Sequence, residues 1–438
     1  MSRKIDVQTE TPGQDRISAL GSVDNRPQTV IVLLPYYLPG FKAGGPIRSV
    51  ANLVDVLGQE LKFRVVTSDR DIKDPLPYHG IKTNRWVRVG NADVMYLSPG
   101  WHGLWKVISL LLSAGPRDVL YLNSFFSKRF SIFPVLLKRM GFIKPQRIVL
   151  APKGEFSEAA LRLKNRKKTC YLKLAGLLKA YRGVVFHASS DYEARDIMRV
   201  FYEERRGQVA NVLPPTRRTS VRSERDSILS SIAIAEDIAR PKAAVGSTRK
   251  TKDRGHLQIV FVSRISPMKN LLGALRMLNG IDGDVVFDIY GPAEDERYWG
   301  ECKDAIAKLP SNIDVGYYGV IEPDRVSEVF AESHLFFLPT LGENYGHVIC
   351  EALLAGCPVL ISDRTPWRNL EENLAGWDVP IEDPTRFKAI LKECVNGDEA
   401  RQTTLSIGAQ NYALERLRSP ELLEANRRLF HRADIDCS

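Results

Sequence analysis

Residues 335–363, LFFLPTLGENYGHVICEALLAGCPVLISD, carry in close succession the signals of a strand, a loop, a helix and a second strand. The apolar run 335–338 ends at Pro339, apolar residues then recur at helical spacing from Val348 to Ala355, and residues 358–361 form another apolar run. A strand, a helix and a strand in this order predict a parallel βαβ unit. Its first loop then lies at the carboxyl end of a strand, the edge of an α/β sheet where ligands bind.

Two carboxylates, Glu343 and Glu351, lie on either side of the point where this loop becomes a helix. A helix of eight residues is about 12 Å long, so the two side chains can reach opposite ends of an extended ligand. Gly342 and Gly346 shape the loop, and the free N–H groups of the first helical turn attract phosphate oxygens. The pattern therefore predicts a phosphorylated, hydroxyl-rich ligand, and a nucleotide-sugar has that shape.

The same alternation of strands and helices extends through two long parts of the chain. A chain of 438 residues exceeds the ~250 to 300 residues at which a single core stops growing. Strand-like apolar runs are found at 29–34, 63–67, 94–97, 118–122, 147–151, 184–188, 258–262, 284–290, 313–318, 335–338 and 358–361. The fold class is therefore predicted to be α/β, with two Rossmann-like, doubly wound parallel-sheet domains.

We predict five parts along the chain. Residues 1–27 form a disordered polar tail and 28–215 an N-terminal Rossmann-like domain. Residues 216–255 are Ser-rich and basic, and are predicted to be a linker with an insertion. Residues 256–398 form the C-terminal Rossmann-like domain, and 399–438 a long helix that packs across the domain junction.

Composition indicates an intracellular protein with an anionic partner. The net charge is +10 and the pI about 9.2, values that fit a phosphate substrate, an acidic lipid surface or a nucleic acid. The six cysteines include no metal-binding spacing, so reduced core thiols are expected. The N-terminus lacks an apolar signal-peptide core, and no apolar run approaches the ~20 residues of a membrane span. A cytoplasmic location is predicted.

Two Asp-x-Asp patterns, at 69–71 and 434–436, resemble motifs with which some transferases hold a metal. Neither neighbours another cluster of ligands, so no metal and no other cofactor is predicted.

Two further loops supply groups for a phosphate. Arg264 and Lys269 follow the strand 258–262 and can clamp a diphosphate, although two solvated loop charges remain an alternative. Gly44 and Gly45 follow the strand 29–34 and permit close approach of the backbone to a phosphate, although an ordinary turn is also possible. The second loop does not spell GxGxxG, so the sequence does not indicate a dinucleotide site here.

Two segments are candidate contact surfaces. Residues 161–182 contain eight Lys and Arg residues, several leucines and no acidic residue, a composition typical of a helix at an anionic membrane surface. A solvated basic face is the alternative. A second candidate surface, for a membrane or an acceptor, consists of Trp101, Leu104, Trp105 and the run 107–112, although buried core is the favoured interpretation. Of two histidines in candidate loops, His187 is expected to be structural, whereas His347 is left open.

These motifs together resemble the retaining glycosyltransferases of family 4, whose GT-B fold consists of two Rossmann-like domains facing each other across a cleft. The likeness is strongest in the E-x7-E pattern from Glu343 to Glu351, then at Arg264 and Lys269, and extends from about residue 29 to residue 430. It implies an acceptor-binding N-terminal domain, a C-terminal domain that binds the nucleotide-sugar, and transfer of sugar to a hydroxyl group. A lipid-linked or glycan acceptor of surface polysaccharide synthesis, at the inner membrane face, fits this resemblance.

The resemblance also implies a role for each site residue. Glu343 would contact the donor sugar, Glu351 the ribose hydroxyls, and the backbone of Asn344, Tyr345 and Gly346 the sugar or the phosphates. Arg264 and Lys269 would neutralise the leaving diphosphate without a metal, so these two and Glu343 are the predicted catalytic residues. Gly44 and Gly45 would complete the donor site.

The chain departs from the family pattern in the N-terminal half. Relatives commonly carry a histidine after the fourth strand, where this chain has Asn123, Ser124 and Phe125, so no catalytic histidine is assigned. Lys153 stands where relatives often have arginine, which keeps the charge but loses the planar fork.

Two alternatives remain open. A sugar-nucleotide epimerase or a glycogen-type polymerising transferase would use the same fold. A non-catalytic basic protein that binds lipid or nucleic acid would use residues 161–182 and the linker, but such a protein has no need of the two donor loops. No nucleic-acid partner is therefore predicted.

Overall fold

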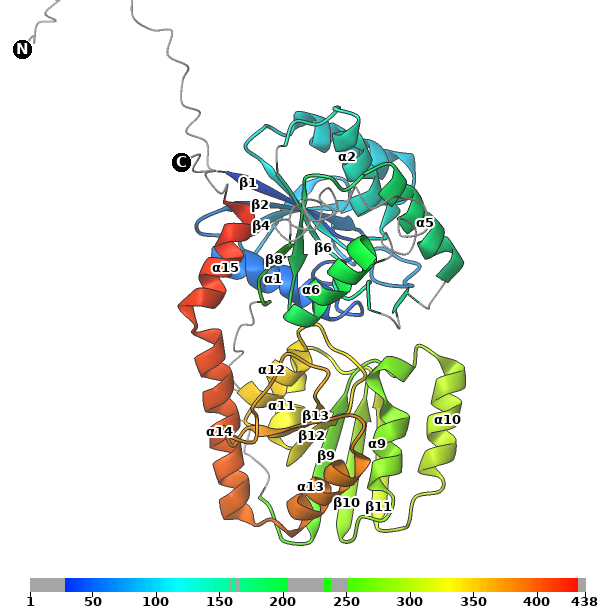
Figure 1. Ribbon diagram of the computed structural model, residues 1–438, viewed down its shortest axis with the longest axis vertical. Helices are drawn as coiled ribbons and strands as arrows, with labels where there is room; N and C mark the ends of the chain where they lie inside the picture. Colours follow the sequence, from blue (N-terminus) through cyan, green and yellow to red (C-terminus); the bar gives the residue numbers. More distant parts are fainter. Residues whose placement is uncertain are drawn as a thin grey trace, which may run out of the picture.

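The computed structural model describes residues 28–145, 147–157, 160–161, 165–203, 232–237 and 251–431. The predicted tail at 1–27, most of the predicted linker and the motif at 434–436 lie outside these residues. Two α/β domains are stacked along the long axis of the molecule, and the C-terminal helices run along one side of both (Figure 1). The expected pair of doubly wound domains is thus confirmed.

The N-terminal sheet has eight described strands, in the order β3-β4-β2-β1-β5-β6-β7-β8. Its central strands are apolar on both faces because helices cover both, as expected of a parallel sheet. The strands are β1 (Thr29–Leu33), β2 (Lys62–Ser68), β3 (Trp86–Val89), β4 (Ala92–Leu97), β5 (Val119–Asn123), β6 (Arg147–Ala151), β7 (Val184–Ala188) and β8 (Ile232–Ile234).

Two strands of this sheet were not predicted. β3 pairs antiparallel with β4 at one edge, and its half-exposed residues lack a continuous apolar run. β8 lies within the range 216–255, for which the sequence predicts a linker, and pairs parallel with β7. The sheet therefore continues beyond residue 215, because a short apolar strand covers the β7 edge.

Helices divide between the two faces of the N-terminal sheet. One core contains side chains of α1 and the last helix of the chain, and the other contains side chains of α2, α3, α5 and α6. The bounds are α1 (Gly45–Leu57), α2 (Trp101–Ser113), α3 (Phe133–Arg139), α5 (Asn165–Leu177) and α6 (Asp191–Met198). The π-helical turns Lys128–Ile132 and Arg199–Glu203 precede α3 and follow α6.

The C-terminal sheet has six described strands, all parallel, in the order β11-β10-β9-β12-β13-β14. The strands are β9 (His256–Val262), β10 (Asp284–Tyr290), β11 (Ile313–Gly319), β12 (Leu335–Leu338), β13 (Val359–Ser362) and β14 (Gly376–Val379). The helices are α9 (Leu271–Leu278), α10 (Glu296–Ile306), α11 (Val326–Ala331), α12 (His347–Leu354) and α13 (Pro384–Asn396).

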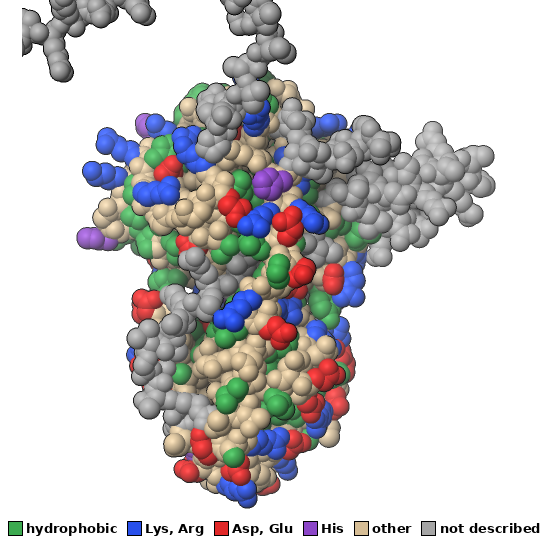
Figure 2. Space-filling model, turned by 90° about the vertical axis from the view of Figure 1, so that its left-hand side faces the viewer, with side chains coloured by type: hydrophobic (Ala, Val, Ile, Leu, Met, Phe, Trp, Pro, Cys, Tyr) green, Lys and Arg blue, Asp and Glu red, His purple; other side chains and the backbone are tan. Residues whose placement is uncertain are grey.

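The C-terminal segment forms two helices, α14 (Glu399–Leu417) and α15 (Pro420–Phe430), where the sequence predicts one. Pro420 lacks an amide hydrogen and restricts the preceding residue, so the helix stops and Ser419 caps its successor. α14 packs against α12, whereas Phe430 of α15 lies edge-on to Phe63 and Tyr121 in the N-terminal core. Acidic and basic side chains are interspersed on the side of the molecule where these helices lie (Figure 2).

No helix among the described residues is both long and apolar enough to cross a membrane.

Candidate active site

The loop that carries Glu343 is tied to the loop after the neighbouring strand. β9 and β12 are adjacent and parallel, so both loops leave the same edge of the sheet. The Met268 carbonyl accepts hydrogen bonds from Leu341 N at 2.8 Å and from Thr340 Oγ1 at 3.1 Å. The Lys269 ammonium consequently forms an ion pair with the Glu343 carboxylate. Lys269 and Glu343, two predicted site residues that lie 74 positions apart in the sequence, are thus in direct contact.

This ion pair is sheltered and lies close to the start of α12. The Lys269 and Glu343 side chains are only 11% and 14% exposed. Gly346 precedes the helix with a φ of 79°, a conformation that costs a glycine little. An ammonium, a carboxylate and free helical N–H groups therefore lie together, and these can bind a phosphate and a sugar hydroxyl side by side.

Glu351 has a different partner, in the other domain. Its carboxylate forms an ion pair with Arg48 of α1, and the two side chains are 32% and 29% exposed. Burial lowers the pKa of Arg48. The two carboxylates of the E-x7-E pattern are thus paired with cations from the two different domains.

The double glycine faces α12 across the domain junction. A β-carbon on Gly45 would lie 3.6 Å from His347 Cδ2, and Gly44 has a φ of 67°. Asp71 holds the preceding loop, because its carboxylate accepts hydrogen bonds from the backbone N–H groups of Phe41 at 2.7 Å and Lys42 at 3.0 Å. The first Asp-x-Asp pattern therefore has a structural use.

A buried polar network joins the domains beside these glycines. Lys153 Nζ donates to Asp237 Oδ1 at 2.5 Å and to Ser189 Oγ at 2.9 Å. Asp237 Oδ2 also accepts a hydrogen bond from Ser49 Oγ at 2.6 Å and lies 3.4 Å from His347 Nε2. The Ser49 hydroxyl is itself 2.9 Å from His347 Nε2. Side chains from three loops and helix α1 of the N-terminal domain thus meet His347 of helix α12 in the C-terminal domain.

Opposing effects act on the carboxyl group at the centre of this network. Burial alone would raise the pKa of Asp237, but the Lys153 ammonium and the hydrogen bond with His347 hold it well below its usual value. Asp237 is therefore ionised at neutral pH. Ser49 and Asp237 were not predicted as site residues. Asp237 could have been found, because it is an acidic residue that closely follows the short apolar run of β8.

Ser190 caps the start of α6, because its hydroxyl oxygen accepts a hydrogen bond from Glu193 N at 3.2 Å. The Glu193 carboxylate accepts hydrogen bonds from Ser189 N at 2.8 Å and from Gly154 N at 2.7 Å. Burial raises the pKa of Glu193. Asn344 Nδ2 of the carboxylate loop approaches Glu193 Oε1 at 3.4 Å. This predicted donor-binding residue thus reaches the N-terminal domain.

His187 is a structural residue, as predicted. Its ring lies 2.9 Å from the Tyr121 hydroxyl and 2.8 Å from the Ala235 carbonyl. Because a carbonyl oxygen only accepts, Nε2 carries the proton and Nδ1 accepts from tyrosine. Burial and the nearby Lys153 ammonium lower the pKa of His187 to about 4, so the ring is neutral at pH 7.

Two predicted site residues are placed differently from the rest. Arg264 is 49% exposed and pairs with Glu294 at 3.1 Å, not with either residue of the Lys269–Glu343 pair. The ring of Tyr345 is buried against Trp367, and its carbonyl accepts a 2.5 Å hydrogen bond from Trp367 Nε1. The side chain of Tyr345 is thus not available to a ligand.

The turn after β5, to which no catalytic histidine was assigned, is fixed by hydrogen bonds to Glu155. Its carboxylate accepts hydrogen bonds from Ser124 Oγ at 2.6 Å and from Phe126 N at 3.0 Å. Ser124 has a φ of 86°, and the buried Asn123 Nδ2 has no hydrogen-bond partner among the described residues. A strained residue and an unsatisfied donor thus mark the carboxyl edge of the N-terminal sheet.

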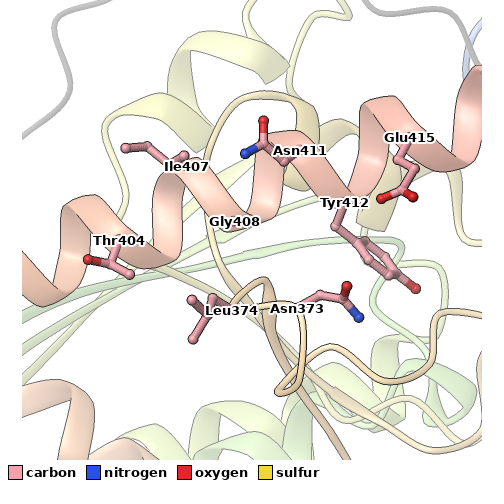
Figure 3. A pocket seen from close by; sticks show the side chains of 8 residues that line it. All are labelled: Asn373, Leu374, Thr404, Ile407, Gly408, Asn411, Tyr412 and Glu415. Carbon is pink, nitrogen blue, oxygen red and sulfur yellow. The ribbon is translucent and has the colours of Figure 1, made fainter.

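One surface hollow is lined by other residues. It has a volume of about 340 Å³ and lies between α14 and the loop that contains Leu374 (Figure 3). Its lining includes Ile407 and Glu415 but no residue predicted for the donor site. Within the described ranges, no group of three or more His, Cys, Asp or Glu residues is arranged to hold a metal.

Comparison with known families supports a GT-B glycosyltransferase. The family model described as "Glycosyl transferases group 1" matches residues 247–409, a range that contains Lys269 and Glu343. A comparison with curated protein sequences gives no match.

Solved structures of similar architecture cover nearly the whole chain. They include HepE of Anabaena in complex with UDP-glucose (15% identity, TM-score 0.59, covering 92% of this chain and 98% of that one). Others are sucrose-phosphate synthase of Thermosynechococcus elongatus (15%, TM-score 0.60, 92% and 97%) and a UDP-forming α,α-trehalose-phosphate synthase of Burkholderia vietnamiensis (13%, TM-score 0.58, 92% and 96%). The predicted GT-B fold is confirmed.

Proposed function

We propose that this protein is a retaining glycosyltransferase of family 4 that moves a sugar from a nucleotide-sugar to a hydroxyl acceptor. The observation that carries the proposal is the Lys269–Glu343 ion pair near the start of α12, in the domain matched by the glycosyltransferase model. An isolated ion pair near a helix terminus is common. This one lies at the carboxyl edge of the sheet, where ligands bind in α/β folds, and its loop leads to His347, which faces Gly45.

The donor is proposed to lie along α12. The ribose hydroxyls would donate hydrogen bonds to Glu351 in place of Arg48. The diphosphate would lie against Lys269. Arg264 would leave Glu294 and also contact the diphosphate. Glu343 would then exchange part of its interaction with Lys269 for hydrogen bonds to the donor sugar. Solved complexes of HepE and UDP-glucose, in a protein of similar fold, support a nucleotide-sugar as the donor class.

The anomeric configuration of the sugar is retained when the acceptor hydroxyl attacks the anomeric carbon from the face that the leaving group departs from. The bond between the anomeric carbon and the phosphate oxygen breaks, the acceptor oxygen bonds to that carbon, and the acceptor proton passes to the leaving phosphate. Negative charge grows on the diphosphate, and preorganised cations stabilise it. Lys269, Arg264 and the helix N-terminus supply this stabilisation, so we propose a metal-independent reaction.

The acceptor is proposed to be a glycan or a lipid-linked intermediate of surface polysaccharide synthesis, used on the cytoplasmic side of the membrane. Two features support this setting: the cysteines in the described residues are all free, and the N-terminal domain is strongly basic.

A thermal-shift panel of nucleoside diphosphates and nucleotide-sugars tests the donor half of the proposal. A matching donor should raise the melting temperature, and release of its nucleoside diphosphate should require an acceptor. NMR of the product should show the donor's anomeric configuration. Conversion of the donor without any acceptor would instead indicate an epimerase, and no shift with any nucleotide would overturn the proposal.

A further inference from the structure

The basic residues of this protein are concentrated in one part of its sequence. Residues 99–182 contain 17 of the 62 Lys and Arg residues but only three of the 52 Asp and Glu residues. The excess of basic over acidic residues in this segment is larger than the net charge of the whole chain, +10. The remainder of the protein is therefore slightly acidic, and one segment must present a basic surface.

Three helices of this segment cover one face of the N-terminal sheet. Val107 and Leu111 of α2, Val135 of α3, and Leu172 and Ala175 of α5 contribute to one common core. The opposite face of the sheet is covered by α1 and α15. The outer sides of α2, α3 and α5 therefore face away from the sheet on the same side of the domain, and α2 and α5 lie well away from α14 (Figure 1).

Large apolar side chains project from these helices into solvent. Trp101 is 74% exposed and Trp105 63%, which corrects the expectation that both are core residues; only the inward side of α2 is buried. Leu177 at the end of α5 is 81% exposed. The other exposed apolar residues of the three helices and of the turns after α3 and α5 are Leu112, Leu136, Met140, Phe142, Leu174 and Leu178. Isolated exposed apolar residues are ordinary, but nine in one segment are not.

Exposed basic side chains lie among these apolar residues. They are Lys106 on α2, Lys128, Arg139 and Lys144 around α3, and Lys167, Lys173, Lys179 and Arg182 on and after α5. The three acidic residues of the segment do not offset them: Glu155 is buried under the β5 turn, Asp118 accepts a hydrogen bond from Gly115 N, and the third, Glu158, lies outside the described residues. The α14–α15 side differs, because charges of both signs are interspersed there (Figure 2).

We propose that α2, α3 and α5 form a single platform that binds the surface of an anionic lipid bilayer. Tryptophan and leucine side chains would enter the interfacial region, while lysines and arginines contact the lipid phosphates. The exposed aliphatic residues favour a bilayer over a nucleic acid, because nucleic acids are bound chiefly by charge, hydrogen bonds and aromatic stacking. The inference extends the predicted basic helix at 161–182 to two further helices and adds an apolar component. It does not depend on the proposed function.

Flotation of the full-length protein with vesicles tests the platform. Vesicles of phosphatidylcholine containing phosphatidylglycerol should carry the protein upward at low salt, and vesicles of phosphatidylcholine alone should carry much less. The double variant Trp101→Ser/Trp105→Ser should bind the anionic vesicles at least ~10-fold more weakly, because two interfacial side chains are lost. Lys167→Glu/Lys173→Glu should show a loss of similar size and a weaker salt dependence.

Matched controls lie on the other domain. Ile407→Ser removes an apolar side chain that is 54% exposed on α14, and Lys303→Glu/Lys308→Glu reverses two exposed charges on and beside α10. Both should float like the unmodified protein, and all variants should keep its melting temperature. Equal flotation of the platform variants and these controls would overturn the proposal. The proposal would also be overturned if the protein bound single-stranded RNA tightly but did not bind vesicles, with RNA binding weakened by the charge reversals and unaffected by the tryptophan changes.

Discussion

Lys153 donates a 2.5 Å hydrogen bond to Asp237 inside the domain junction, where the two side chains are only 7% and 6% exposed. Lys153 lies directly after β6, and Asp237 lies after β8 at the edge of the same sheet. A buried charge without a counter-charge is strongly destabilising, whereas an apolar pair in its place often is not. The two residues should therefore depend on each other for their contribution to stability.

Lys153→Met should lower the free energy of unfolding by about 3 to 5 kcal/mol, because Asp237 would remain buried without its counter-charge. The double variant Lys153→Met/Asp237→Leu should lose less of its free energy of unfolding than this single variant. Urea unfolding of the unmodified protein, Lys153→Met, Asp237→Leu and the double variant measures the coupling, with the exposed Lys173→Met as the control. Losses that simply add in the double variant would contradict the dependence of one residue on the other.

Stability should also fall in mild acid because of His187. Its pKa is lowered from 6.5 to about 4 in the folded protein, so the unfolded chain takes up this proton first as the pH falls. The neutral His187 ring contributes fully to the free energy of unfolding above pH 6.5. This contribution, roughly 3 kcal/mol in total, is lost progressively as the pH falls to about 4. In His187→Gln this part of the pH dependence of unfolding should be absent.

His102→Gln is the matched control, because His102 is exposed on α2. Its profile should follow that of the unmodified protein. If His187→Gln loses as much stability between pH 6.5 and pH 4 as the unmodified protein, other groups cause this loss and the neutral His187 ring does not explain it.

Much of the fold could be predicted because the buried parallel strands are continuous apolar runs. β6, β7, β10 and β12 have the residue ranges expected from the sequence. β3 was missed because an edge strand is half exposed, and β8 because it is only three residues long and lies beside a basic, polar stretch. Strand periodicity carries little signal in either case.

The site was predictable only where its residues share a local motif. The loops with Lys269 and Glu343 each follow a strand, and adjacency of β9 and β12 brings them together. Contacts across the domain junction have no such local signature. Arg48 with Glu351 and Ser49 with His347 depend on how the two domains meet, which no single stretch of sequence encodes.

Glu351→Gln should weaken the binding of the matching nucleoside diphosphate by roughly 10- to 100-fold, because charge-assisted hydrogen bonds from the ribose are lost. Isothermal titration calorimetry measures the change. The 2′,3′-dideoxy analogue should bind the variant and the unmodified protein about equally, since it has no hydroxyls to donate. An equal loss for both nucleotides would mean that Glu351 acts through Arg48 and not on the ribose.

Turnover should depend on both members of the Lys269–Glu343 pair. Lys269→Met removes a cation beside the leaving diphosphate, and Glu343→Gln removes the carboxylate proposed to contact the donor sugar. Each should lower kcat by at least about 100-fold, by analogy with loss of one preorganised group around a developing charge. Glu371→Gln, which breaks the exposed ion pair with Arg386 in the same domain, should leave turnover unchanged. Near-normal kcat in both site variants, with the melting temperature retained, would remove this ion pair from the catalytic mechanism.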